Sequence, residues 1–277
     1  MKALARSLAE SVRALVRGYV ALFRLSWAEM LQYRASVFLW TLWSLAGPII
    51  HLAVWSSVIE AEGALQGYDR GSIVAYFIIQ SIVYHFTGAW QAYDFSYLIR
   101  TGTLSVRLLR PFDPSHYIVA NNVAFKLINL VWLIPIWTGM VLYFRPEMEL
   151  TWQRAVWFLI SMSLSAALYF LWAHCWAMVA FWTIRASAFF EFTDWVGYFI
   201  GGGFAPIALL PGGLREAVVY LPPYYWTGFP IEVAIGAVES SMILTGLAVT
   251  SLWIVLLFLI YRILWRLGLK RYGAVGA

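Results

Sequence analysis

The sequence predicts an all-α integral membrane protein. Its elements are an N-terminal amphipathic interfacial helix, six transmembrane helices, and outer re-entrant half-helices between the fifth and sixth spans. Hydrophobic residues make up 62% of the 277 residues and charged residues only 12%, about half the usual charged share. A soluble globule cannot bury so much apolar surface, and the mean hydropathy of +0.74 agrees. The apolar residues form long runs without the alternation of barrel strands, so the predicted bundle is helical.

The spans are placed by length, because a helix that crosses a bilayer needs about 20 mostly apolar residues. Besides five clear apolar runs there is a sixth, 187–210, which precedes the last of them and is therefore the fifth span in chain order. It contains both carboxylates and glycines. Glu191 and Asp194 lie near its start, and Gly201, Gly202 and Gly203 lie in its middle. We expect residues 1–277 to form a single transmembrane domain. The five clear runs are 35–59, 72–90, 118–144, 155–184 and 242–264.

Six spans place both termini on one side of the membrane, and the charges identify that side. Fourteen Lys and Arg residues lie there, or fifteen with Lys126, whereas the other side has four arginines against eight carboxylates. By the positive-inside rule, both termini are cytoplasmic. The cations are spread over membrane-flanking segments rather than along one stripe, which argues against nucleic-acid binding. The single cysteine, Cys175, excludes a disulfide within the chain.

Residues 1–27 predict the interfacial helix. At 100° per residue, Arg6, Arg13, Arg17 and Arg24 share one face and apolar residues occupy the opposite face. Such a helix lies in the headgroup layer with its arginines toward anionic lipid. Contact with a cytoplasmic partner is the alternative that this pattern leaves open.

The connection 91–117, between the second and third spans, predicts a short cytoplasmic helix. A Thr-Gly-Thr break at 101–103 ends any helix before it, and prolines at positions 111 and 114 end the next one. This helix either rests on lipid or docks into a groove of a soluble partner. Its apolar face and its cations are Leu104, Leu108, Leu109, Arg107 and Arg110.

The stretch 205–236 is apolar but repeatedly interrupted by proline and glycine. The pieces between the prolines are too short to span. They predict half-helices that dip into the outer leaflet, where protein or water must cover their irregular backbone. A proline-rich surface loop is the alternative.

Polar groups inside the spans mark either helix interfaces or a transport path, because they are costly in lipid. Asn122, Lys126 and Asn129 share one face of the third span. Glu191 and Asp194 lie three residues apart on one helix face. We expect them either to form salt bridges with Arg185 or Lys126 or to receive a cation. The three glycines at 201–203 predict either a hinge or a close-packing site.

Motifs of enzymes are absent from the sequence. No lysine follows a glycine as a P-loop requires, and zincin and nucleophile-elbow spacings do not occur. His51, His85 and His174 lie on three different spans without nearby carboxylates, which predicts packed histidines rather than a metal site. The sequence therefore indicates a protein that is not an enzyme.

Several features together produce a family resemblance. The cytoplasmic segment has the pattern Gly-x-Leu-x-x-x-Leu-Leu-Arg-Pro, Phe181 and Trp182 close the fourth span, and a proline-rich stretch precedes the last span. With the interfacial helix and six spans, essentially the whole chain resembles the permease subunits of bacterial ABC-2 type exporters, in particular an uncharacterised ABC-2 permease branch. The residues of the segment pattern are Gly102, Leu104, Leu108, Leu109, Arg110 and Pro111.

The resemblance implies a multi-pass protein of the bacterial cytoplasmic (inner) membrane. The loop 91–117, including Arg107, would hold the coupling helix that inserts into a separate ATP-binding subunit, and Arg185 would make a second, smaller contact. Two permease chains would pair, as a homodimer or with a related permease. ATP and Mg would bind the partner subunit, so this chain would carry no cofactor.

Two other functions remain open at the level of sequence. A secondary transporter driven by an ion gradient would have paired broken helices in both halves, and a broken segment occurs only in the second half. A non-transporting membrane scaffold is the other alternative. The abundant aromatic residues favour a hydrophobic, amphipathic or cationic substrate over a sugar phosphate.

Overall fold

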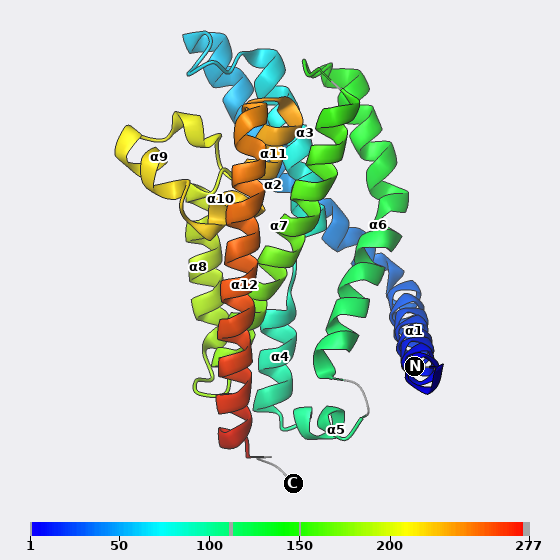
Figure 1. The fold of residues 1–277 in the computed structure, drawn as a ribbon. Coiled ribbons are helices and arrows are strands. Elements are labelled where there is room, and N and C mark those ends of the chain that lie inside the picture. Colours follow the sequence, from blue (N-terminus) through cyan, green and yellow to red (C-terminus); the bar gives the residue numbers. More distant parts are fainter. Residues whose placement is uncertain (1, 111–112, 150, 274–277) are drawn as a thin grey trace. The chain divides into compact units, whose positions relative to one another are not determined.

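The computed structural model describes the backbone of residues 2–110, 113–149 and 151–273, and the side chains of these residues except 2–12, 14 and 15. All regular secondary structure in this part is helical, which confirms the all-α prediction (Figure 1). The elements are α1 (Lys2–Gln32), α2 (Arg34–Glu62), α3 (Arg70–Thr87), α4 (Gln91–Arg100), α5 (Leu104–Leu108), α6 (Pro114–Phe144), α7 (Trp152–Val179), α8 (Ala186–Ile200), the 3-10 helix η1 (Ile207–Leu209), α9 (Gly212–Val218), α10 (Pro222–Trp226), α11 (Gly228–Ile235) and α12 (Ser240–Arg271).

Among the described residues, five helical stretches are long and apolar enough to cross a membrane. They are α2, α3 together with α4, α6, α7 and α12. The predicted fifth span forms α8, whose 15 residues extend about 22 Å, less than the roughly 30 Å of a hydrocarbon core. The helix ends at Gly201 instead of continuing to residue 210. A crossing by this segment stays a prediction.

The second span reaches further than its apolar run indicated. After an interruption at residues 88–90 the chain resumes as α4, with Phe95 fully buried. Residues 91–100 were expected in the cytoplasmic connection, but they form a helix that packs on α7. The side-chain amide of Gln91 donates to the Phe170 carbonyl at 2.6 Å, so this polar residue has a partner at the interface. The break at 101–103 is confirmed, and Gly102 adopts φ +73° there.

The described residues group into two compact units, and α2 and α6 contribute to both. The first unit is drawn from Met1–Leu42 and Leu104–Ile136, and the second from Trp43–Thr103 and Trp137–Ala277. Each unit therefore joins segments that are distant in the sequence.

In the first unit, α6 contacts both α1 and α2. The Tyr117 hydroxyl donates to the Glu29 carboxylate at 2.8 Å, and Tyr19 hydrogen-bonds His116. Farther along α6, the rings of Phe38 and Trp132 meet edge to face with centroids 5.2 Å apart. These contacts join the start of α6 to α1 and a later part of α6 to α2.

In the second unit, α7 is the central helix. It packs against α3, α4, α8, α10, α11 and α12, and it runs beside α12 in Figure 1. The α3 helix is buried nearly all round, with Ile73, Tyr76 and Phe77 inaccessible. A helix that is apolar on every side is expected to be surrounded by other helices.

The proline-rich segment forms four short helices, η1, α9, α10 and α11. Pro211 precedes α9 and Pro222 begins α10, where the missing N–H has no intrahelical partner to lose. The α10 and α11 helices are buried against α7, whereas α9 is largely exposed. The predicted interruption into short helices is confirmed, and the insertion into a leaflet stays a prediction.

Candidate functional site

The coupling segment predicted at residues 104–110 forms a shorter helix than expected. The α5 helix ends at Leu108, and the Arg110 N–H closes a turn on the Arg107 carbonyl at 3.2 Å. Leu104 is fully buried and anchors the start of the helix, whereas Leu109 at its end is 88% exposed. Pro111 lies outside the described residues.

The two arginines of this segment differ in their surroundings. The Arg107 guanidinium lies 4.5 Å from the centroid of the Tyr117 ring, a cation–π contact within the chain, and it is half-buried. Arg110 is exposed beside Leu109. An exposed leucine next to an arginine at the end of a short helix is suited to an interface, where apolar and Arg side chains are used as anchors.

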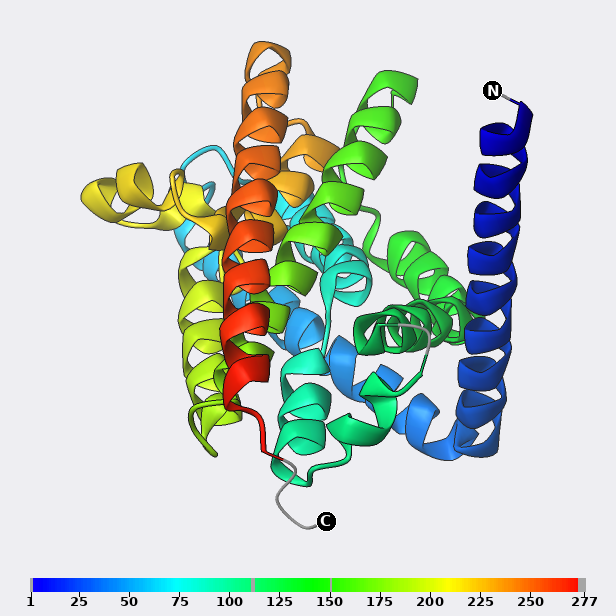
Figure 2. The same cartoon turned by 60° about the horizontal axis from the view of Figure 1, so that its bottom comes forward.

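Gly102, which precedes α5, is hydrogen-bonded to a residue near the C-terminal end of the chain. The Tyr272 hydroxyl donates to the Gly102 carbonyl at 2.7 Å, across 170 positions of sequence. Figure 2 shows the end of α12, in red, next to the end of α4. The Phe181 ring packs on Tyr272 and lies so close to Gly268 that a Cβ there would be 2.1 Å from it. The ends of α4, α7 and α12 therefore meet where the chain turns into α5.

We expect Tyr272→Phe to loosen this turn. The net contribution of one hydrogen bond is about 1 kcal/mol, which corresponds to roughly fivefold more frequent local opening. Hydrogen–deuterium exchange of the purified chain should accelerate by that factor over 99–108 and not elsewhere. Tyr143→Phe is the control, because Tyr143 is 81% exposed. Unchanged exchange in Tyr272→Phe would show that the contact does not order the turn.

Arg185, the predicted second contact, is exposed in the second unit and immediately precedes α8. Its backbone N–H donates to the Thr183 hydroxyl at 3.2 Å, and its carbonyl accepts from Ala188. The turn is thus held by its backbone, and the guanidinium extends from it. Arg185 and α5 belong to different units.

The three polar residues predicted on one face of the third span have different environments. Asn129 is fully buried, hydrogen-bonds Thr41 of α2, and donates to the Phe125 carbonyl at 2.8 Å. Asn122 is also buried, and Lys126 is half-buried. Asn129 therefore lies in the interface between α2 and α6.

Glu191 and Asp194 of α8 lie among tyrosines. The Tyr169 hydroxyl donates to Asp194 Oδ1 at 2.7 Å, and Tyr93 of α4 lies near Glu191. The neighbours described for these carboxylates are therefore tyrosines of α4 and α7, where the sequence had predicted pairing with Arg185 or Lys126. The other alternative for this pair, that it receives a cation, stays a prediction.

The glycines at 201–203 form a closely packed turn. A Cβ at Gly201 would lie 2.5 Å from the Pro223 carbonyl oxygen. All three carbonyls are hydrogen-bonded. Gly201 accepts from the Gly228 N–H at 2.8 Å, Gly202 from the Tyr76 hydroxyl at 2.7 Å, and Gly203 from the Gln80 amide. This geometry favours close packing over a hinge.

Sequence reasoning missed a buried carboxyl group in the proline-rich segment. Glu232 of α11 is only 7% exposed and accepts a hydrogen bond from the Tyr224 hydroxyl at 2.7 Å. Burial raises the pKa of Glu232 to about 7, against the opposing effects of Tyr224 and the Arg215 charge. Its charge had been assigned to the outer side, and no pattern in the sequence indicated that the side chain is buried.

The raised pKa predicts a pH dependence of stability. Because the folded protein holds this proton more tightly than the unfolded chain, stability falls as pH rises from about 4.5 to about 7. The slope is at most about 1.4 kcal/mol per pH unit. Glu232→Gln should remove this part of the dependence. The measurement is thermal exposure of the buried thiol of Cys175, the only cysteine, to a thiol-reactive dye at pH 5 and pH 8. Equal pH dependence in both proteins would contradict the assignment.

The three histidines expected in helix packing lie among aromatic rings. His51 contacts Phe77 and Tyr198, and His174 lies between Phe170 and Tyr261. His85 meets Trp137 edge to face with ring centroids 5.9 Å apart. These contacts place the rings in helix interfaces.

The comparisons with known proteins identify the class. Residues 45–276 match the family of ABC-2 family transporter proteins. Except for the beginning of α2, the match covers all the described helices that are long and apolar enough to cross a membrane. The chain belongs to this family and is a transmembrane permease of the ABC-2 type. No curated protein and no solved structure matches the chain.

Proposed function

We propose that this chain is the transmembrane subunit of an ATP-driven exporter. It would form the translocation path with a second permease chain, either identical or related, and separate ATP-binding subunits that hold ATP and Mg would power it. The observation that supports this best is the predicted coupling segment, in which Leu109 and Arg110 are exposed at the end of α5, in a chain of the ABC-2 family.

In this proposal α5 docks into the ATP-binding subunit, and Arg185 adds a smaller contact. Movement of the docked segment reaches the membrane through the turn at Gly102, because α4 precedes that turn and Tyr272 at the end of α12 is bonded to it. A difference in substrate contacts between two states of the permease pair would then select what is exported.

The proposed topology has six spans with both termini in the cytoplasm of a bacterium. The fifth crossing would use α8 and the chain up to residue 210, and α10 and α11 would be re-entrant. Two observations support the re-entrant arrangement: these short helices are buried, and they pack against α7. Non-helical backbone at membrane depth requires such cover by protein.

The proposed substrate is hydrophobic, amphipathic or cationic. Glu191 and Asp194 lie beside tyrosines, and Trp195 on the same helix is 69% exposed. Carboxylates and aromatic faces together attract organic cations. In this proposal Asn122 and Lys126 of α6 border the path, whereas Asn129 holds α2 and α6 together.

The test is purification of the tagged chain from its native host in mild detergent. We expect an ATP-binding chain to co-purify in stoichiometric amount, and the complex to hydrolyse ATP. Absence of an ATP-binding chain, together with gradient-driven uptake by liposomes that contain the chain alone, would contradict the proposal.

A further inference from the structure

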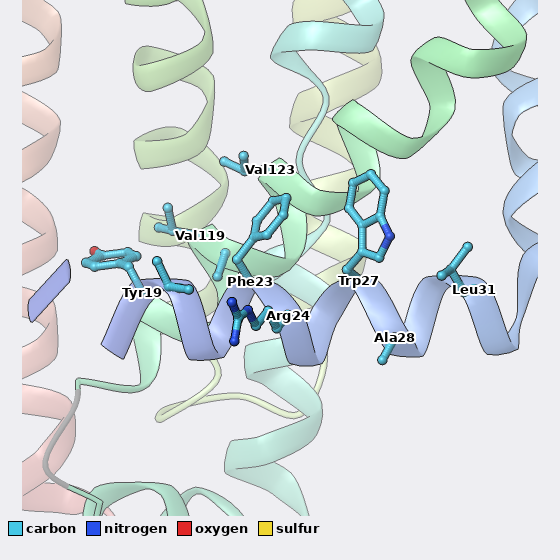
Figure 3. A pocket seen from close by; sticks show the side chains of 10 residues that line it. Tyr19, Phe23, Arg24, Trp27, Ala28, Leu31, Val119 and Val123 are labelled. Atoms are coloured by element: carbon cyan, nitrogen blue, oxygen red, sulfur yellow. The ribbon is translucent and has the colours of Figure 1, made fainter. Parts of the chain in front are cut away.

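An open apolar groove lies in the first unit, between α1 and the beginning of α6. Its volume is about 740 Å³, and ten residues line it. Figure 3 shows Phe23 and Trp27 rising from α1 toward Val119 and Val123 of α6. The lining is apolar except for the Tyr19 hydroxyl, which hydrogen-bonds His116, and Arg24.

Arg24 gives this groove a charge. Its side chain is exposed and lies beside Phe23 in Figure 3. Glu29 is the one carboxylate among the described side chains of α1, and it accepts a hydrogen bond from Tyr117. The mouth of the groove is therefore cationic and suits an anion.

The groove continues into an apolar strip on α6. Val123, Leu127, Val131 and Ile134 are all more than 40% exposed, and their spacing places them within about 80° of one another on the helix. From Val123 to Ile134 the helix rises about 16 Å, close to the roughly 15 Å of hydrocarbon in one leaflet. The strip therefore has the length of one acyl chain that begins beside Arg24.

We infer that this groove binds one anionic phospholipid, with its phosphate at Arg24 and an acyl chain between Phe23, Trp27 and the strip on α6. Because the groove is concave, it contacts the acyl chain on two sides, whereas a single lipid-facing helix contacts it on one. The arginine adds a charge-assisted hydrogen bond, and its fixed guanidinium geometry fits a phosphate.

Native mass spectrometry of the purified full chain in detergent tests the inference. Phosphatidylglycerol or phosphatidylcholine is added at equal concentration, and the fraction of chain that retains one lipid is measured. We expect phosphatidylglycerol to be retained preferentially. Arg24→Gln should weaken retention of phosphatidylglycerol about fivefold, the effect of roughly 1 kcal/mol per cation near a membrane surface. It should weaken retention of phosphatidylcholine less, because the choline group offsets the charge of that lipid's phosphate. Val123→Trp should fill the groove and lower retention of both lipids.

Arg17→Gln is the matched control, because it removes the same charge from the same helix outside the groove. Val20→Trp fills the groove from the α1 side at a 45% exposed position, in case Val123→Trp does not fold. If Arg17→Gln and Arg24→Gln lower the retention of phosphatidylglycerol equally, the effect comes from the general surface charge of the helix, and the inference is overturned. Undiminished retention in a folded groove-filling variant, or equal retention of both lipids by the unchanged protein, would also overturn it.

Discussion

Leu109→Asp combined with Arg110→Glu is expected to abolish coupled transport. The double variant replaces an 88% exposed leucine and the exposed arginine next to it with two negative charges. If these side chains are buried in a groove of the ATP-binding subunit, each introduced carboxylate is desolvated without a partner, which costs several kcal/mol. We expect co-purification of the ATP-binding subunit to fall at least a hundredfold and substrate-stimulated ATP hydrolysis to disappear.

The fold should survive this double change, because neither side chain is in the core. Retained helical circular dichroism and unchanged thermal exposure of Cys175 would establish that. Arg266→Glu is the control, because it reverses an exposed charge on α12 outside the coupling segment. If the double variant still binds the ATP-binding subunit and transports substrate, residues 104–110 are not the coupling element.

Local composition was sufficient to predict most of the fold. Hydropathy located five spans, and the Thr-Gly-Thr sequence located the break before α5. The helices extend beyond the apolar runs because a polar residue can continue a helix when its side chain has a hydrogen-bond partner. Gln91 does so through the Phe170 carbonyl, and α4 therefore lengthens the second span. Hydropathy averages over a window and does not register such a single interaction.

The candidate site was predictable only where its residues are adjacent in sequence. The predicted coupling segment is one short stretch, so its pattern was visible in the sequence. The bonds from Tyr272 to Gly102 and from Tyr169 to Asp194 join different helices, and helical periodicity states which face a residue occupies but not which helix it meets. For the same reason the sequence left a hinge and close packing equally open at the glycines 201–203.

Gly202→Ala is expected to be the most destabilising single substitution considered for this chain. Gly202 has φ +98°, which residues with a Cβ rarely adopt. An added Cβ would lie 2.6 Å from the Tyr76 hydroxyl and 2.9 Å from the Gly228 Cα, so backbone as well as side chain must move. Backbone strain and overpacking together should cost roughly 3 kcal/mol, a fall of about 6–10 °C in the temperature at which the Cys175 thiol becomes exposed.

Gly213→Ala separates this packing effect from the general effect of replacing glycine. A Cβ at Gly213 meets nothing within 4 Å, its φ is not positive, and it lies in the exposed helix α9. Alanine there should leave stability unchanged or raise it slightly, because alanine favours a helix over glycine. If Gly202→Ala instead melts with the unchanged protein, the turn adapts readily and acts as a hinge. A large loss confined to Gly202 means that α8, α3 and the start of α11 are packed tightly together at this turn.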